Sequence, residues 1–534
     1  MWIEALAVTA VGLWSSAKVT LRFLQFFQQE EYDPRRFLAW WRATRSVERR
    51  MSLFYLVVSL CLGVATNISS EVVTIVGVSG AFVLLLAGWS LRFSPSKKPL
   101  RVTGRLQRLI VLVTLLQGGI LLGAVSCCED LPVLWPLAGL LMMQLTPLAI
   151  VAANALLWPV EKGIRQFYLA SAKKRLRVLD PIVIGITGSY GKTSTKHLIA
   201  QVCQSAAPCL ATPGSVNTLM GVTRVIREQL REEHHTFVVE MGAYRRGSIR
   251  SLCDLTHPRV AVLTKIGIAH LERFRSIEVV TQAKAELPLS LSETGCLVYN
   301  ADDPLCRMIA SQVSCQTLSF GTDPTLAPLD LWIKQVQPLP EGLDIEWVYQ
   351  GRAYHALLPL HGLHQAANAS AALLVGIACE IPLLQGIASL RSATATPHRC
   401  QVSCVNGVTW IDDSYNSNPI GFRNALEVLK SLPGERSFLV TPGMIELGHS
   451  SDQEHVALAA AIAQSADHVC LVAARRLQAL EQALRQCGLT EERVHCFEDF
   501  QAAREWLLLQ LKAGDKVLLE NDLPDLHERG SAFC

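Results

Sequence analysis

The stretch PIVIGITGSYGKTSTK, residues 181–196, decides how the second part of the chain folds. An apolar run rich in β-branched residues leads into a glycine-rich turn, and a segment typical of a helix follows. Backbone N–H groups of such a turn hold phosphate oxygens, a lysine reaches the terminal phosphates, and a hydroxyl ligates magnesium. Ile186 stands where the strict eight-residue phosphate-loop pattern has its first glycine. A shorter T-G-x-x-G-K-T pattern therefore predicts a nucleotide-binding loop carried by Gly188, Gly191, Lys192 and Thr193.

Short β-branched runs alternate with longer helical patterns after this loop, which predicts an α/β fold with mostly parallel sheets. The expected strands are 182–186, 237–240, 260–265, 409–412, 438–441, 469–472 and 516–519. The expected helices between them include 369–379, 421–432 and 454–463.

The segment SATATP, residues 392–397, has the small, proline-terminated composition of a linker. It divides the α/β part into a central ATP-binding domain, 181–396, and a C-terminal Rossmann-like domain, 397–534.

The charge of the chain is unevenly distributed along its 534 residues. Its formal charge of +3 combines +11 up to residue 178 with −8 beyond it, and only 18% of the residues are charged. In soluble domains, about a quarter of all residues are usually charged. The composition excludes a disordered chain or a small disulfide-rich one. It also argues against a nucleic-acid partner, because the positive charge lies between hydrophobic runs.

Five apolar stretches near the N-terminus each approach the roughly 20 residues that a helix needs to cross a bilayer. They lie near 3–20, 52–70, 72–91, 109–127 and 132–158, and they predict a five-helix transmembrane domain over residues 1–160. Lysines and arginines occupy alternate loops, which places the N-terminus outside. A basic cytoplasmic linker, 161–180, would then join a multi-pass domain of the cytoplasmic membrane to catalytic domains in the cytoplasm.

The α/β part resembles the Mur ligases, a family that builds the peptides of bacterial cell-wall precursors with ATP. The resemblance rests on motifs in the family's order: TGSYGKTS (187–194), NTLMG (217–221), VVEMGA (238–243), KIGIAHLERF (265–274), AKAE (283–286), GLHQAANASAA (362–372), PHRCQ (397–401) and IDDSYNSNP (411–419). The last motif is most similar to the ligases that add D-alanyl-D-alanine.

The resemblance implies an ATP-dependent amide ligase. Such an enzyme transfers the γ-phosphoryl group of ATP to a carboxylate, and an amine then attacks the acyl phosphate. The implied ATP-binding residues are Gly188, Ser189, Tyr190, Gly191, Lys192, Thr193, Ser194, His364, Asn368, Arg399 and Asp413. The implied substrate residues are Asn217, Asn416 and Asn418. The implied Mg²⁺ ligands, direct or indirect, are Thr193, Glu240, His270 and a carbamylated Lys284. Together with Lys192, the last three are the expected catalytic residues.

The resemblance is weaker where the substrates would bind. The family usually has a soluble N-terminal domain for the uridine-diphosphate end of its substrate, and the apolar stretches occupy that place here. We therefore expect an acceptor carboxylate at the membrane, either lipid-linked or on a polymer, and an amino acid or short peptide as the amine. Near the end, LLENDLPD, residues 518–525, stands where the D-alanyl-D-alanine ligases carry a Lys-Gly-Ser type segment. Its acidic side chains suit an incoming ammonium group, although a solvated acidic tail has the same composition.

Two other functions remain open at the level of sequence. One is a poly-amino-acid polymer synthase of the same fold. The other is an ATP-driven membrane transporter or sensor, against which the apolar stretches offer few ionisable residues to line a pathway.

Overall fold

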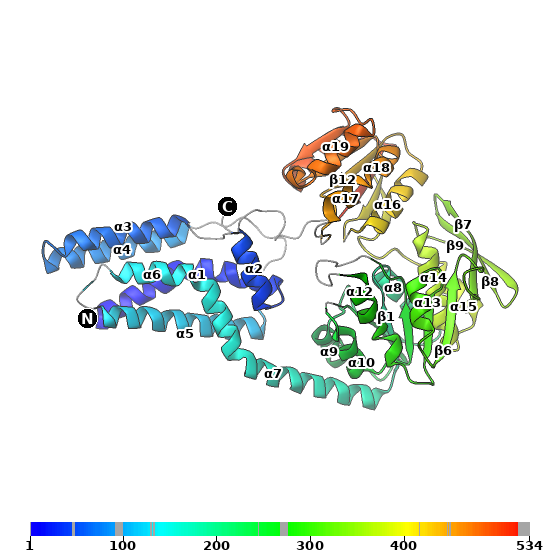
Figure 1. Cartoon of the computed structure of the whole chain (residues 1–534), viewed down its shortest axis with the longest axis horizontal. Helices are drawn as coiled ribbons and strands as arrows, with labels where there is room; N and C mark the ends of the chain where they lie inside the picture. The colour runs from blue at the N-terminus through cyan, green and yellow to red at the C-terminus, as the bar shows by residue number, and fades with distance from the viewer. Residues whose placement is uncertain are drawn as a thin grey trace. The chain divides into compact units, whose positions relative to one another are not determined.

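The computed structural model describes residues 2–44, 49–90, 100–128, 131, 134–243, 245–267, 276–415, 417–445, 447 and 450–521. These residues form two compact units, one up to Arg165 and one from Gln166 onward. Figure 1 shows the elements of both units.

The first unit is helical throughout its described elements. Its helices are α1 (Trp2–Gln29), α2 (Pro34–Thr44), α3 (Arg49–Ala65), α4 (Ser70–Ser90), α5 (Gly104–Cys127), α6 (Leu134–Gln144) and the first part of α7 (Thr146–Leu179). Helix α2 lies in a basic segment that was predicted to be a loop. It is helical because its apolar face is buried, with Phe37 packed edge-on against Phe23 and Phe27 of α1.

The five predicted spans all coincide with helices, but a five-helix transmembrane domain is not shown. Among the described residues one helix, over Gly104–Ala124, is long and apolar enough to cross a membrane. A second span results only if α6 and α7 count as one, across a bend of 65°. The bend corrects the prediction of a single helix over 132–158. Its cause is Pro147 in the first turn of α7, because proline lacks the N–H that would continue α6.

The segment predicted as a linker, 161–180, is the C-terminal half of α7. The side chains of Ala172 and Leu176 are buried in one of the hydrophobic cores of the second unit. This part of α7 is therefore packed as an element of the second unit.

The middle domain of the second unit is built on a sheet with nine described strands, in the order β2-β3-β1-β4-β5-β6-β7-β8-β9. These strands are β1 (Ile182–Thr187), β2 (Cys209–Ala211), β3 (Thr236–Glu240), β4 (Val260–Leu263), β5 (Cys296–Asn300), β6 (Gln316–Gly321), β7 (Leu331–Leu339), β8 (Gly342–Tyr349) and β9 (Arg352–Leu358). The predicted strands β1, β3 and β4 are confirmed. The antiparallel pairs β7–β8 and β8–β9 were not predicted.

Helices cover both faces of this sheet (Figure 1). The helices α8 (Lys192–Gln204), α14 (His364–Ala378) and α15 (Leu383–Leu390) share a core with one face. The other face is covered by α9 (Leu219–Glu228), α10 (Ser248–Thr256), α12 (Ile277–Ala285), α13 (Pro304–Ala310) and the end of α7. A short 3₁₀ helix, η1 (Pro288–Ser290), follows α12.

The C-terminal domain has a sheet with six described strands, in the order β10-β11-β15-β12-β13-β14, parallel except for the edge strand β10. Its elements are β10 (Gln401–Val405), β11 (Val408–Asp413), α16 (Pro419–Ser431), β12 (Ser437–Thr441), α17 (Ser451–Val456), α18 (Ala459–Ser465), β13 (His468–Val472), η3 (Ala474–Arg476), α19 (Gln478–Gln486), β14 (Val494–Phe497), α20 (Phe500–Gln510) and β15 (Lys516–Glu520). The predicted strands are again confirmed, whereas the helix expected over 454–463 is divided between α17 and α18.

Two carboxyl groups meet where β11 and β15 end. The parallel register pairs Asp413 with Glu520, and Glu520 is fully buried with its Oε1 accepting a hydrogen bond of 2.5 Å from Ser417 Oγ. Burial, and then the charge of Asp413, raise the pKa of Glu520 well above its usual value. Burial also raises the pKa of Asp413 to about 6, although the Cys400 N–H and Arg399 oppose the shift. Burial and the neighbouring carboxyl group therefore disfavour the charged form of Glu520, which makes it a poor partner for an incoming ammonium group.

We predict that this pair makes the C-terminal domain less stable as the pH rises. A carboxyl group whose pKa is raised on folding stabilises the fold fully below its unfolded-state pKa, about 4. That stability is lost as the pH rises through the folded-state pKa, which is about 6 for Asp413 and well above the usual value for Glu520. Glu520→Gln has the same size without the charge, so its thermal unfolding temperature should fall less between pH 5 and pH 8. Glu505→Gln, on the exposed surface of α20, is the matched control. Parallel pH profiles for wild type and Glu520→Gln would contradict the raised pKa of Glu520.

Candidate active site

The phosphate loop occupies residues 188–191, between the end of β1 and the start of α8. Gly188 has φ +150°, and a Cβ there would lie 2.0 Å from Thr264 Oγ1. Gly191 has φ +78° at the N-cap of α8, and a Cβ there would lie 2.7 Å from Asn368 Oδ1. Both the backbone conformation and the close neighbours therefore require glycine.

The segment that follows β4 holds this loop in place. Ser189 N donates to Lys265 O at 2.6 Å, and Ser189 Oγ exchanges hydrogen bonds with the backbone N and O of Gly267 at 3.0 and 2.9 Å. Thr264 Oγ1 donates to Tyr190 O at 2.6 Å. Burial raises the pKa of Tyr190 to about 12, so its hydroxyl stays protonated.

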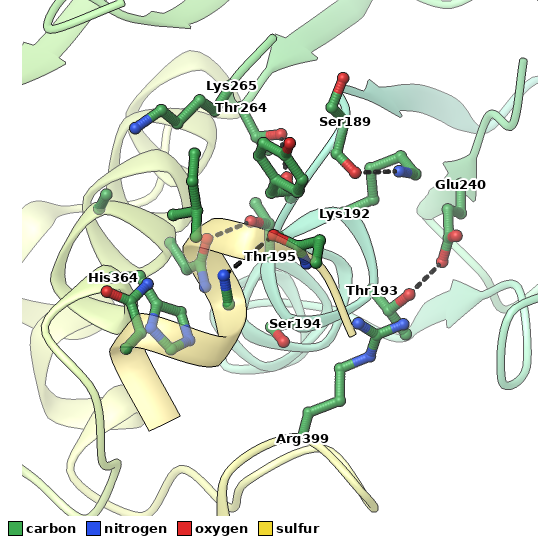
Figure 2. A pocket seen from close by; sticks show the side chains of 18 of the residues that line it. Ser189, Lys192, Thr193, Ser194, Thr195, Glu240, Thr264, Lys265, His364 and Arg399 are labelled. Atoms are coloured by element: carbon green, nitrogen blue, oxygen red, sulfur yellow. Dashed lines mark hydrogen bonds between the residues drawn. The ribbon is translucent and has the colours of Figure 1, made fainter. Parts of the chain in front are cut away.

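Lys192 folds back over the loop (Figure 2). Its Nζ donates to the carbonyl oxygens of Gly188 at 2.7 Å and Ser189 at 3.2 Å. Burial lowers its pKa to about 8, with Glu240 opposing the shift. Lys192 is therefore positively charged at neutral pH and lies where the phosphates of a nucleotide would bind.

Glu240, the last residue of β3, is 1% exposed and accepts three hydrogen bonds. Its Oε2 accepts from Thr193 Oγ1 at 3.0 Å and from Lys196 Nζ at 3.2 Å, while its Oε1 accepts from Asn217 Nδ2 at 3.0 Å. Burial acts to raise the pKa of Glu240, but Lys196 and Lys192, together with these hydrogen bonds, hold it below its usual value. Glu240 is therefore a buried carboxylate anion.

Thr193 and Glu240 fit a magnesium ion in the chemistry of their donors. A hydroxyl and a carboxylate oxygen lie 3.0 Å apart, and Mg²⁺ is commonly bound by one or two protein oxygens together with phosphate and water. Among the described residues no group of three His, Cys, Asp or Glu side chains could hold a metal ion. The predicted ligand His270 belongs to 268–275, outside the described residues.

Lys284, near the end of α12, lines the same pocket and is 4% exposed. Burial and the charge of Lys192 lower its pKa well below the usual value, against the opposing charges of Glu240 and Glu286. Among the described residues no carboxylate forms an ion pair with it. An unpaired ammonium group at this depth is costly.

His364 and Asn368 form the side of the pocket made by α14. Burial and Arg399 lower the pKa of His364 to about 4, so its ring is neutral, and its buried Nδ1 has no partner among the described residues. Asn368 Oδ1 accepts from Thr195 Oγ1 at 3.0 Å, and its Nδ2 donates to Gln365 Oε1 at 2.9 Å. This hydrogen-bonded pair fixes α14 against the phosphate-loop helix.

The C-terminal domain also contributes to the lining of the pocket, whose volume is about 540 Å³. Arg399 and Asp413 both line it, and the Arg399 guanidinium lies 4.3 Å above the ring of Tyr415. Figure 2 shows the Arg399 side chain extending toward Thr193. Asn418 lines the pocket as the N-cap of α16, accepting from Gly421 N at 2.9 Å. The predicted substrate residue Asn416 lies outside the described residues.

The structure thus brings together every described residue of the predicted site: Gly188, Ser189, Tyr190, Gly191, Lys192, Thr193, Ser194, Asn217, Glu240, Lys284, His364, Asn368, Arg399, Asp413 and Asn418. Sequence reasoning missed Lys196, whose fully buried ammonium is the ion-pair partner of Glu240. Its spacing was a usable signal, because Lys192 and Lys196 are one helical turn apart and share a face. Tyr415, beneath Arg399, was also missed.

Residues 186–376 match the Mur ligase middle domain, and residues 398–520 match the Mur ligase glutamate ligase domain. A UDP-N-acetylmuramoyl-tripeptide–D-alanyl-D-alanine ligase of Mycobacterium tuberculosis is 35% identical over 282 residues, which cover 51% of this chain and 54% of that protein. The ligase of the same name in Bacillus subtilis is 32% identical, over 53% of this chain and 61% of that protein. The chain thus spans little more than half the length of these curated relatives.

Solved structures agree with this relationship. MurF from Acinetobacter baumannii has a TM-score of 0.61 at 27% identity, with 68% of this chain and 78% of that chain covered. MurF from Thermotoga maritima in complex with ADP has a TM-score of 0.60 at 27% identity, with 68% and 82% covered. With two consecutive domain matches and the same fold, the part of this chain from residue 186 to residue 520 belongs to the Mur ligase family.

Proposed function

We propose that this protein is an ATP-dependent ligase that joins a carboxylate to an amine and releases ADP and phosphate. One observation carries the proposal. The phosphate loop, the Thr193–Glu240 pair and the buried Lys284 line one pocket, which Arg399 and Asp413 also line. A pocket of about 540 Å³ suits a nucleotide with a small reacting group.

The residues of the pocket match what acyl-phosphate chemistry requires. Transfer of the γ-phosphoryl group places negative charge on the phosphoryl oxygens, so catalysis depends on positioning and electrostatic stabilisation. The Lys192 ammonium and the N–H groups at the start of α8 would hold the phosphates. Thr193 and Glu240 would hold Mg²⁺, which would neutralise charge on the β- and γ-phosphates. The Arg399 guanidinium, stacked on Tyr415, adds a further positive charge.

Carbamylation would explain how the protein tolerates the buried, unpaired side chain of Lys284. Carbon dioxide adds to the neutral amine of a buried lysine and yields a carbamate anion with a proton released. Burial favours that neutral amine, because the pKa of Lys284 is well below its usual value. The carbamate would place two oxygen atoms in the pocket and remove the unpaired positive charge.

The named relatives suggest the substrates. They are ligases of a UDP-N-acetylmuramoyl-tripeptide and D-alanyl-D-alanine, so we propose a peptide carboxylate of a cell-envelope precursor as acceptor and an amino acid or short peptide as amine. The two family matches begin at residue 186 and at residue 398, so both lie after the helical unit. A lipid-linked or polymeric acceptor is therefore the proposed alternative to a nucleotide-linked one.

We also propose that the helical unit anchors the protein in the cytoplasmic membrane, with the ligase domains in the cytoplasm. Large apolar side chains of its helices are more than half exposed, as expected of a surface that faces lipid. They include Leu53, Leu60, Val64, Ile75, Val78, Phe82, Leu115, Leu141 and Leu156. Basic residues before α3 and in the second half of α7 would face the cytoplasm.

The ligase activity predicts a mass gain that depends on ATP and on an amine. Membranes containing the protein should extend a muramyl tripeptide acceptor, nucleotide-linked or lipid-linked, and release ADP, as measured by mass spectrometry. Lys192→Ala should reduce the rate at least about a thousandfold, because a phosphate-binding charge is lost. Steady ADP release without any amine would instead favour a transporter or a sensor.

Carbamylation predicts a chemical rescue. Lys284→Ala should lose most activity, and short carboxylates such as acetate should restore part of it by supplying the missing anion. Lys173→Ala, at a basic position of α7 that does not line the pocket, is the control and should keep full activity without added carboxylate. Absence of rescue by carboxylates of several sizes would count against the carbamate.

Membrane anchoring predicts on which side of the membrane the C-terminal end of α5 and the second half of α7 lie. A reporter fused after Cys128 should score outside the cytoplasm, and one fused after Gly163 should score inside. A cytoplasmic score at Cys128 would rule out the proposed orientation.

A further inference from the structure

A second cleft, with a volume of about 890 Å³, lies where the ends of α7 and α9 meet. Four basic side chains line it, with two acidic ones: Lys174, Arg175, Arg227, Arg231, Glu232 and Glu233. We call it the basic cleft. None of its residues lines the nucleotide pocket.

The walls of the basic cleft are fixed by packing. On α7, Leu176 is buried in the core that also holds α9, so the helix cannot turn its basic side away. Arg175 Nε and Nη2 donate to Leu230 O at 3.0 and 2.6 Å, which closes the end of α9 onto α7. The Arg227 guanidinium lies 4.1 Å from the ring of Tyr168. Arg231 Nη1 also donates to Leu230 O, at 3.3 Å, and keeps its other guanidinium N–H groups. Lys174, Arg227 and these N–H groups of Arg231 therefore remain for a ligand, with Arg227 already oriented.

The charges of the basic cleft favour an anion with several oxygen atoms. Among the described residues no ion pair joins its bases to Glu232 or Glu233, and the four bases outnumber the two acids. Lys174 and Arg231 are exposed, whereas Arg227 is half-buried. Guanidinium groups bind phosphate through two parallel hydrogen bonds, and an ammonium group adds a point charge. Two linked phosphates offer enough acceptor oxygens for all three.

Helix α9 links the basic cleft to the nucleotide pocket. Its N-cap is Thr218, directly after Asn217, which lines the pocket and binds Glu240. Arg227 lies in its last turn. Ten helical residues rise about 15 Å. An extended peptide of three residues spans about 10 Å, so a tripeptide and one sugar would cover the distance between the reacting carboxylate and a diphosphate.

We propose that the basic cleft binds the diphosphate of the carboxylate acceptor. This inference rests on the proposed function, since the ligase reaction supplies the acceptor. Of the candidate acceptors, the nucleotide-linked and the lipid-linked ones carry this group, esterified to a nucleoside in the first and to a lipid in the second. The cleft, built from α7 and α9, thus supplies phosphate recognition next to the domain that activates the carboxylate.

Direct binding tests the cleft without any turnover. The full chain in detergent, with its phosphate loop saturated by a non-hydrolysable ATP analogue and Mg²⁺, is titrated with UDP and with farnesyl diphosphate. At least one probe should bind, and Lys174→Ala/Arg231→Ala should weaken it about tenfold or more through loss of two charged hydrogen-bond donors. Arg224→Ala is the matched control, because Arg224 is an exposed base on α9 that pairs with Glu228 outside the cleft.

The two probes distinguish a nucleotide-linked from a lipid-linked source of the diphosphate. Binding of UDP alone identifies a nucleotide-linked acceptor, whereas binding of farnesyl diphosphate alone identifies a lipid-linked one. Binding of both, with the same loss in the double variant, supports recognition of the diphosphate itself. If neither probe binds, or if the double variant binds both as the wild type does, the proposal is overturned.

Turnover then separates this proposal from the ligase function. With a diphosphate-bearing acceptor, the double variant should raise KM for the acceptor about tenfold and leave kcat and the KM for ATP unchanged. With a muramyl tripeptide that lacks the diphosphate, wild type and double variant should behave alike. Loss of binding in the double variant together with an inactive wild type would refute the ligase function and retain the anion site.

Discussion

The Glu240 carboxylate is the interaction on which the site depends. It is almost fully buried, and it accepts hydrogen bonds from Thr193, Lys196 and Asn217. The donors come from two parts of the domain: Thr193 and Lys196 lie on α8, and Asn217 lies directly before the N-cap of α9. Removing one partner of a buried ion pair is far more costly than the pair itself is stabilising. Loss of Glu240 would leave the Lys196 ammonium without its anion in the interior of the protein.

The same carboxylate sets the electrostatics of the pocket. Lys192, Lys196 and Arg399 contribute positive charge close to the Glu240 anion, and Asp413 lines the same pocket. A surplus of positive charge in a partly buried pocket suits a triphosphate, because each phosphate oxygen gains from a low-dielectric surrounding. Burial and the charge of Lys192 favour the neutral form of the Lys284 amine, and Glu240 opposes them. The balance of charges around Glu240 thus bears both on the affinity of the pocket for phosphate and on the reactivity of a lysine in it.

Sequence reasoning succeeded where local chemistry decides the structure. Glycines at positive φ, a lysine and a threonine at a fixed spacing, and short β-branched runs located the phosphate loop and most parallel strands. It failed where the structure of a segment depends on a partner that is distant in sequence. The ion pair of Lys196 follows only once β3 places Glu240 beside it, and α2 is helical because α1 covers Phe37. The burial of Glu520 depends on the β11–β15 register, which no local pattern reveals.

The pairing of Asp413 with Glu520 makes the charge at this edge of the C-terminal sheet depend on the pH. A lysine at position 520 would offer Asp413 a permanent cation. Glu520 instead brings a second acid, whose charged form burial and Asp413 both disfavour. The charge of this buried pair therefore varies with the pH of its surroundings, whereas a lysine at that position would carry a fixed charge.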